Sequence, residues 1–216
     1  MRFRDVRRQL EEVYTRAILS GISARQHNPS IVDPVRIGDL GSTAFSLKNI
    51  PYAQVYSELD RHNRYHLKLI DGALLQFQYS FDEVGLTKHR LAYFPTPELP
   101  TVEEAPELYE NDELYGDMIV HRLVRFPIRF DFDPANYSPT FHPHAHLTLG
   151  QFENCRIPAS HPLSPNIFFL FLLRNFYFRI YRKNQNIFDK HISSCSTTRC
   201  ITDHELRITS IGIGKT

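Results

Sequence analysis

The chain has 216 residues, 42% of them hydrophobic, and its 16 Phe and 11 Tyr supply enough bulky side chains for the core of one domain. Lys and Arg number 25 against 24 acids, so net charge gives no overall attraction to nucleic acid or to a membrane. Three cysteines are too few for a disulfide scaffold. We expect a single cytoplasmic domain over residues 1–216 without a membrane partner, because the amino terminus lacks a signal-peptide core and the apolar run at 167–173 is too short to span a bilayer.

Apolar residues at helical spacing first appear over residues 3–20, between Val6 and Ile18, with Arg and Glu on the opposite side. This pattern predicts an amphipathic amino-terminal helix that ends near Gly21. Residues 52–63, which follow a proline, predict a second helix.

Strand-forming residues dominate positions 65–81, in two runs that flank Asp71-Gly72. Asp-Gly accommodates the two positive φ angles of a type I′ turn, so the sequence predicts a β-hairpin here. Residues 88–95 predict a third strand. The following segment, 95–117, holds eight acids and no base, which indicates either a solvated acidic loop or a docking surface for a basic partner.

Two more strands are predicted at 119–133 and 144–152, as neighbours joined by a loop. The segment that begins at Ser164, SPNIFFLFLLRNFYF, predicts a buried helix because it is apolar on all sides. Residues 183–205 predict a polar, irregular insertion, and the alternating sequence ELRITSIGIG after it indicates a final edge strand. Together these elements predict an α+β fold, an antiparallel sheet with helices packed on one face.

Acids and histidines alternate in the segment RFPIRFDFDPANYSPTFHPHAHLTLG. Asp131 and Asp133 are two residues apart on one predicted strand, and His144 and His146 are two apart on the next, so each pair projects from one face. Antiparallel pairing would bring the four side chains to one patch. Such a patch suits a divalent metal whose bound water attacks a phosphodiester. The alternative is a hydrogen-bonded structural network in which Asp133 starts a turn.

His146 and Thr148 form a His-x-Thr motif that resembles one half of a two-histidine phosphoesterase, where imidazoles act as acid and base and hydroxyls hold phosphate. The second half would be His191-Ile192-Ser193, in a polar stretch with weak strand character.

Arg156, near a strand end and beside His161, suits two roles. Its guanidinium either holds a phosphate or pairs with the carboxylates of Asp131 and Asp133.

Four side chains that bind zinc in other proteins lie close together near the carboxyl end: His191, Cys195, Cys200 and His204. Zinc accepts Cys and His in a tetrahedron, and such sites stabilise short irregular segments. The spacing matches no standard zinc finger, so a metal site and separate structural roles both stay open. Basic residues between Arg174 and Lys215, beside aromatic residues, suit single-stranded nucleic acid, although those aromatic residues also suit the core.

The run from FDFDP through HPHAHLTLG to CRIPASHPLSP and FLLRNFY resembles the bacterial domain-of-unknown-function family 2290, most strongly over residues 120–180. The likeness fades toward the carboxyl end, where the four zinc-capable side chains lie. The resemblance implies a small protein encoded beside a helicase, in pairs that act as anti-phage defence systems. It brings no established activity and no catalytic residues.

The resemblance thus implies the non-motor subunit of a helicase-based module. The chain itself has no phosphate-cradling Gly-x4-Gly-Lys-Ser/Thr loop, so a motor would have to come from the helicase partner. We expect a subunit that acts through protein and nucleic-acid binding. The alternative is a hydrolase of phosphodiester bonds, metal-assisted or acid–base, that uses Asp131, Asp133, His144 and His146.

Overall fold

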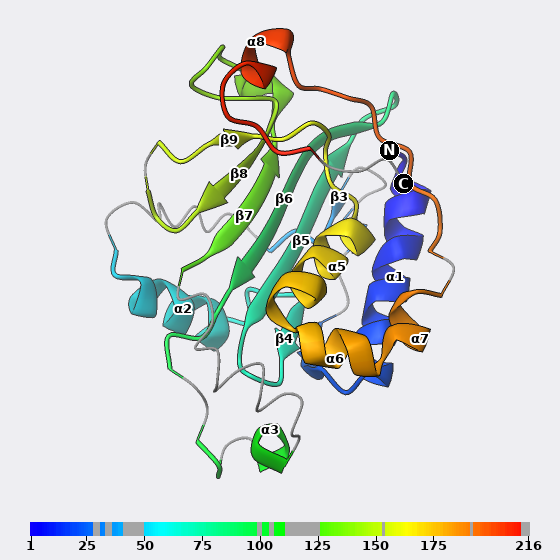
Figure 1. Ribbon diagram of the computed structural model, residues 1–216, viewed down its shortest axis with the longest axis vertical. Helices are drawn as coiled ribbons and strands as arrows, with labels where there is room; N and C mark the ends of the chain where they lie inside the picture. The colour runs from blue at the N-terminus through cyan, green and yellow to red at the C-terminus, as the bar shows by residue number, and fades with distance from the viewer. Residues whose placement is uncertain are drawn as a thin grey trace.

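The computed structural model describes residues 1–27, 31–32, 36–40, 50–98, 101–103, 106–110, 126–152, 154–190 and 192–212. Its strands are β1 (Ser23–Gln26), β2 (Ile31–Val32), β3 (Arg36–Ile37), β4 (Leu67–Leu69), β5 (Leu74–Phe81), β6 (Leu86–Phe94), β7 (Ile128–Phe132), β8 (Ala145–Leu149) and β9 (Ile157–Pro158). They form one antiparallel sheet in the order β1-β4-β5-β6-β7-β8-β9, and β3 pairs with both β2 and β5 (Figure 1). The predicted α+β architecture is confirmed.

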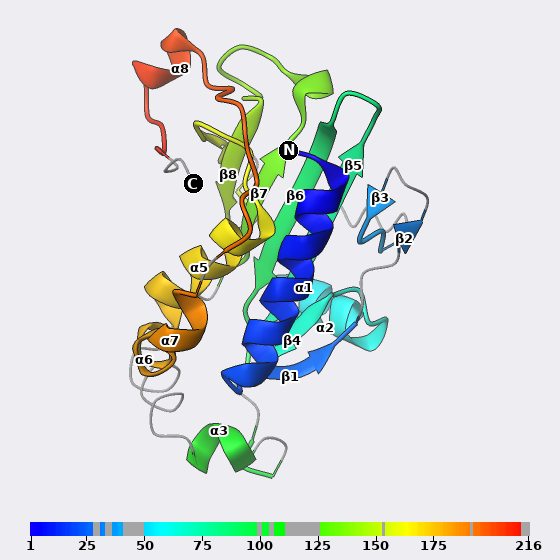
Figure 2. The ribbon, with the colours of Figure 1, turned by 90° about the vertical axis from the view of Figure 1, so that its right-hand side faces the viewer.

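The helices are α1 (Phe3–Leu19), α2 (Tyr52–Arg61), α3 (Pro106–Glu110), α5 (Pro165–Phe176), α6 (Phe178–Lys183), α7 (Gln185–Phe188) and α8 (Asp203–Leu206), with a 3-10 turn η2 (Pro134–Asn136). Helices α1 and α5 pack against each other and cover one face of the sheet (Figure 1). Helix α2 differs from the expected arrangement because it packs on the opposite face, against Leu74, Ala92 and Phe94 (Figure 2). No helix in the described ranges is long and apolar enough to cross a bilayer.

The main core lies between the sheet and the pair α1 and α5. Helix α1 buries Val6, Leu10 and Val13, which follow the helical spacing read from the sequence, and it ends before Gly21, whose φ is +71°. Helix α5 places Phe168 edge-on to Phe77, with ring centroids 5.7 Å apart. Both predicted helices are therefore confirmed, and their apolar sides face the same side of the sheet.

The hairpin predicted around Asp71-Gly72 is present as β4 and β5, but its turn is not of type I′. In this loop, which is described in full, only Gly72 has a positive φ, at +90°. The Leu69 N–H donates to the Ala73 carbonyl, which closes a three-residue loop with one left-handed position. Asp71 instead turns its carboxylate inward, where it accepts hydrogen bonds from the Ala73 N–H and the Tyr177 hydroxyl.

The carboxyl-terminal region departs from the predicted edge strand. Within the predicted insertion 183–205, residues 192–202 form neither helix nor strand, but α7 lies in its first part and α8 begins at its end. The next residues form α8, because Thr202 and Glu205 make a reciprocal capping box that starts a helix. Among the residues of this predicted strand that the structure describes, 205–212, a single parallel bridge is present, between Ile211 and Ala159. In the acidic segment 95–117, residues 99–100, 104–105 and 111–117 lie outside the described residues, and α3 forms in the described part.

Candidate functional site

Strands β7 and β8 pair as predicted, and their register brings the acidic and histidine segments together. Asp131 lies opposite His146 on β8 and opposite Arg90 on β6. The pairing continues beyond the strands, since the Asp133 N–H donates to the His144 carbonyl over 2.9 Å. These side chains project from the face of the sheet turned away from α1 and α5. We call this the open face, of which α2 covers one end; its polar residues on β3, β5, β6 and β7 are Arg36, Gln76, Gln78, Ser80, Lys88, Arg90, Arg129 and Asp131.

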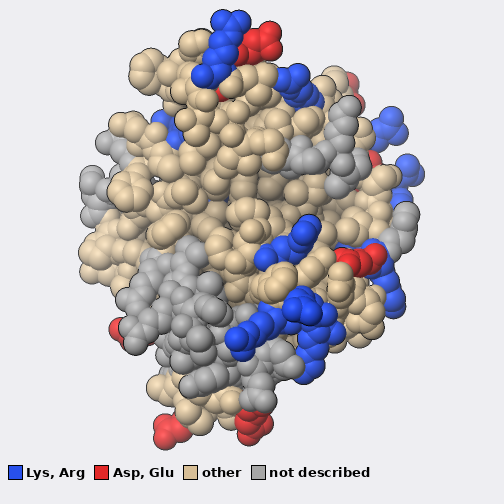
Figure 3. Space-filling model, in the orientation of Figure 1, with Lys and Arg blue, Asp and Glu red and all other residues tan. Residues whose placement is uncertain are grey.

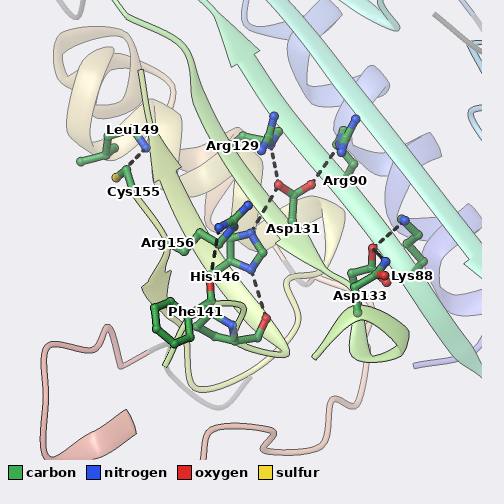
Figure 4. A network of polar contacts seen from close by, with 12 residues as sticks. Lys88, Arg90, Arg129, Asp131, Asp133, Phe141, His146, Leu149, Cys155 and Arg156 are labelled. Atoms are coloured by element: carbon green, nitrogen blue, oxygen red, sulfur yellow. Dashed lines mark hydrogen bonds and ion pairs between the residues drawn. The ribbon is translucent and has the colours of Figure 1, made fainter. Parts of the chain in front are cut away.

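Asp131 is the centre of a compact ionic network (Figure 4). Its carboxylate accepts a hydrogen bond from Arg90 Nε on one oxygen, over 3.0 Å, and from Arg129 Nε on the other. Only 8% of the side chain is exposed. Burial raises the pKa of this carboxyl, but the attraction of Arg129, Arg90 and His146 outweighs it and the pKa is lowered. Asp131 is therefore an anion at pH 7, and each of its two oxygens accepts a hydrogen bond from an arginine.

His146 lies beside this anion with 2% of its surface exposed. Its Nε2 is 3.7 Å from the nearer Asp131 oxygen, while its Nδ1 donates to the Pro143 carbonyl over 3.2 Å. Burial lowers the pKa of His146 to about 4, even though Asp131 favours the charged form. The imidazole is thus neutral and enclosed at pH 7, which is typical of a structural histidine.

Asp133 and His144 point to partners of their own. The Asp133 carboxylate accepts hydrogen bonds from Lys88 Nζ over 2.6 Å and from Asn136 Nδ2 over 2.9 Å. Burial raises the pKa of Asp133, and these two hydrogen bonds more than compensate, so the pKa is lowered. Asp133 also precedes η2, as expected of a residue that starts a turn. The half-buried His144 ring stacks on Tyr137, with centroids 3.9 Å apart.

The other predicted members of the patch contribute less. Arg156 Nη1 donates to the Phe141 carbonyl over 3.2 Å (Figure 4), so the expected pairing of Arg156 with the two carboxylates is wrong. Their cations come from β6 and β7, which lie closer in the sheet. The Thr148 hydroxyl is buried and has no hydrogen-bond partner within the described ranges.

The second His-x-Ser/Thr motif does not meet the first. Ser193 donates its hydroxyl and its N–H to the carboxylate of Glu12 on α1. It therefore lies on the helix side of the sheet, whereas His146 belongs to the open face. His191 lies outside the described residues.

The described members of the proposed zinc cluster have separate surroundings. Cys195 is buried, the Cys200 thiol lies 3.7 Å from the Ser160 carbonyl oxygen, and His204 Nε2 lies 3.2 Å from the Thr140 hydroxyl. Across the part of the chain that the structure describes, no three His, Cys, Asp or Glu side chains are placed to hold a metal ion.

Sequence reasoning missed the cations of the open face. A hollow of about 430 Å³ on this face is lined by Arg36, Lys88 and Arg90 together with Gln78 and Ser80. The alternation of Lys88 and Arg90 in the predicted strand 88–95 was the available signal, since residues two apart on a strand share a face. Arg36 had no such signal, because its pairing with β5 spans a long stretch of chain.

No curated protein and no solved structure matches the chain. A family model described as an uncharacterized conserved protein, DUF2290, matches residues 22–213. The match includes the acidic and histidine segments and continues through Cys195, Cys200 and His204, further toward the carboxyl end than the sequence motifs indicated. The chain therefore belongs to the DUF2290 family of uncharacterized conserved proteins.

Proposed function

We propose that this protein is the non-motor subunit of a bacterial helicase-based anti-phage defence module and that it acts by binding rather than by catalysis. The helicase context is what the family resemblance implies. The observation that supports binding over catalysis is the state of Asp131: its two carboxylate oxygens accept hydrogen bonds from Arg90 and Arg129, and its side chain is 8% exposed.

The alternative, a phosphodiester hydrolase, has weaker support from the same geometry. A metal needs free oxygen or nitrogen lone pairs, and a general base works best with a pKa near the working pH. Each Asp131 oxygen already accepts a hydrogen bond from an arginine, and burial lowers the pKa of His146 to about 4. His144 is stacked on Tyr137, and Asp133 is paired with Lys88.

Co-expression with the neighbouring helicase, followed by size-exclusion chromatography at micromolar concentration, tests the proposed role. We expect both chains to elute together in one peak of higher mass than either alone. Two separate peaks would contradict the assignment of this protein as a helicase subunit.

His144→Phe separates binding from hydrolysis. Phenylalanine keeps a flat ring against Tyr137 but has no nitrogen to carry a proton or bind a metal. A binding subunit should retain phage protection with this variant, measured as plaque number on cells that carry the defence pair. Loss of protection, with an unchanged melting temperature and an intact helicase complex, would favour the hydrolase.

A further inference from the structure

We propose that the open face binds single-stranded nucleic acid through the hollow lined by Arg36, Lys88 and Arg90. This inference rests on the proposed function and names the partner class that the binding subunit recognises. Four observations carry it: the placement of the cations, the burial of their counter-ions, the net charge of the hollow and its size.

The cations lie on neighbouring strands and project from one face. Arg36 on β3 is opposite Ser80 on β5, which is opposite Lys88 on β6, and Arg90 follows two residues after Lys88. Because strands are spaced about 4.8 Å apart, Arg36 and Lys88 are separated by roughly 10 Å across the sheet. Helices α5, α6 and α7 lie on the other side of the sheet (Figure 2), and α2, which shares this face, packs against Leu74, Ala92 and Phe94 rather than against this row.

The carboxylates that pair with Lys88 and Arg90 are buried beneath them, whereas Asp39, the partner of Arg36, is partly exposed. The side chains of Asp131 and Asp133 are 8% and 13% exposed, whereas those of Arg90 and Lys88 are 45% and 50% exposed. Arg90 uses Nε for Asp131, and its two Nη groups have no hydrogen-bond partner in the described ranges. The buried acid therefore orients the guanidinium while leaving its outer edge available for a phosphate.

Charge and size favour a single strand. Three cations and one carboxylate, Asp39 at 3.6 Å from Arg36, line the hollow. With Asp131, Asp133 and Arg129, which lie against these cations, there are four cations and three carboxylates, a net charge of four minus three, or +1. Ser80 and Gln78 add polar side chains between the cations. A volume of about 430 Å³ admits a nucleotide-sized group and excludes a duplex. A positively charged groove that follows the backbone is how single-strand binders gain affinity.

A second basic surface lies on the opposite side of the molecule and supplies a matched control. Lys and Arg gather over α6 in Figure 3, which views the helix side. Helix α6 carries the exposed Arg179, Arg182 and Lys183, two arginines and one lysine like the hollow. Arg182 also lies over the Phe178 ring, 6.0 Å from its centroid.

The test measures, by fluorescence anisotropy, how tightly the full chain without helicase binds a labelled oligo(dT) of about 20 nucleotides. The triple variant Arg36→Gln, Lys88→Gln and Arg90→Gln should bind on the order of 100-fold more weakly at about 50 mM salt. The slope of log affinity against log salt should fall by about 2, since each lost phosphate contact removes about 0.7 for a single strand. The α6 triple, with Arg179, Arg182 and Lys183 changed to Gln, should bind like wild type.

Several results would overturn the inference: no binding by wild type, equal losses in both triples, or a loss confined to the α6 triple. If a duplex of the same length binds as tightly or more tightly, the assignment of single-stranded nucleic acid as the ligand is refuted. If polyglutamate competes with oligo(dT) as well as unlabelled oligo(dT) does, the ligand is an acidic protein instead. Arg36→Gln alone serves as the fold-safe variant, because Arg36 pairs with the partly exposed Asp39 rather than with a buried acid. If the chain co-elutes with the helicase but does not bind oligo(dT), this inference is refuted and the proposed function still stands.

Discussion

Asp131→Asn removes the charge at the centre of the open-face network and keeps the shape of the side chain. Removing one partner of a fully buried ion pair costs about 3–5 kcal/mol. Here the partners are partly exposed, Arg129 at 24% and Arg90 at 45%, so water recovers part of their solvation. The amide oxygen also still accepts one hydrogen bond. We therefore expect the free energy of unfolding to fall by about 2 kcal/mol at pH 7.

The pH dependence of this loss is the sharper test. The pKa of Asp131 is lowered below 3.8 in the folded protein, so its carboxylate stabilises the fold above the unfolded pKa and loses that effect as the pH falls through the folded pKa. The difference in free energy of unfolding between wild type and Asp131→Asn should be constant from pH 8 to pH 5 and should become smaller below pH 4.

Urea unfolding followed by far-ultraviolet circular dichroism measures this difference, since the chain has no Trp. Asp133→Asn is the matched control. Its partner Lys88 is 50% exposed, so the loss should stay below about 1 kcal/mol. A loss for Asp131→Asn no larger than that of the control, or one unchanged at pH 3, would refute the account of the network.

Three further changes test other parts of the structure by urea unfolding. Burial raises the pKa of Asp71 to about 6, so the protonated carboxyl stabilises the fold at low pH, and this contribution is lost as the pH rises from 3.8 through 6. Asp71→Asn should therefore raise the free energy of unfolding by about 1–3 kcal/mol at pH 8 and leave it unchanged near pH 4. Equal effects at both pH values would contradict this. Gly38→Ala should cost at least about 3 kcal/mol, because its φ is +75° and a Cβ would lie 2.1 Å from the Phe77 carbonyl, whereas Gly21→Ala, at φ +71° with nothing within 4 Å, should cost about 1 kcal/mol; similar costs would show that the contact does not matter. The pKa of His146 falls from 6.5 to about 4 on folding, so wild type should lose stability between pH 6.5 and pH 4 more steeply than His146→Gln; parallel curves would mean that the imidazole titrates normally.

Local sequence patterns predicted the elements that position the site. Alternation of acids and histidines at a spacing of two was enough to place Asp131 beside His146, because a strand repeats its side-chain direction every two residues. The alternating residues of ELRITSIGIG predicted a strand, but the first of them, Glu205, instead forms a capping box with Thr202 and starts a helix. Alternation of apolar and polar residues alone does not decide between helix and strand when a signal for a helix start is present.

Long-range pairing accounts for what the sequence did not reveal. Arg90 reaches Asp131 from a strand 41 residues earlier, and Arg36 reaches the same surface only through the pairing of β3 with β5. No spacing pattern in the sequence indicates that Arg90 or Arg36 lies on this surface. The prediction of a type I′ turn was wrong for a related reason: the hydroxyl of Tyr177, 106 residues away, donates a hydrogen bond that holds the Asp71 carboxylate in the interior.

The contacts between α1 and the carboxyl-terminal region bear on how the chain folds during synthesis. Glu12 binds the backbone and hydroxyl of Ser193, 181 residues later, and Gln9 accepts a hydrogen bond from the Asn166 N–H, 157 residues later. A ribosome synthesises α1 well before either of these two partners. The strands that follow α1 cover part of its apolar side early, but the contacts with Asn166 and Ser193 form only after most of the intervening sequence has been made, so α1 reaches its final position late in folding.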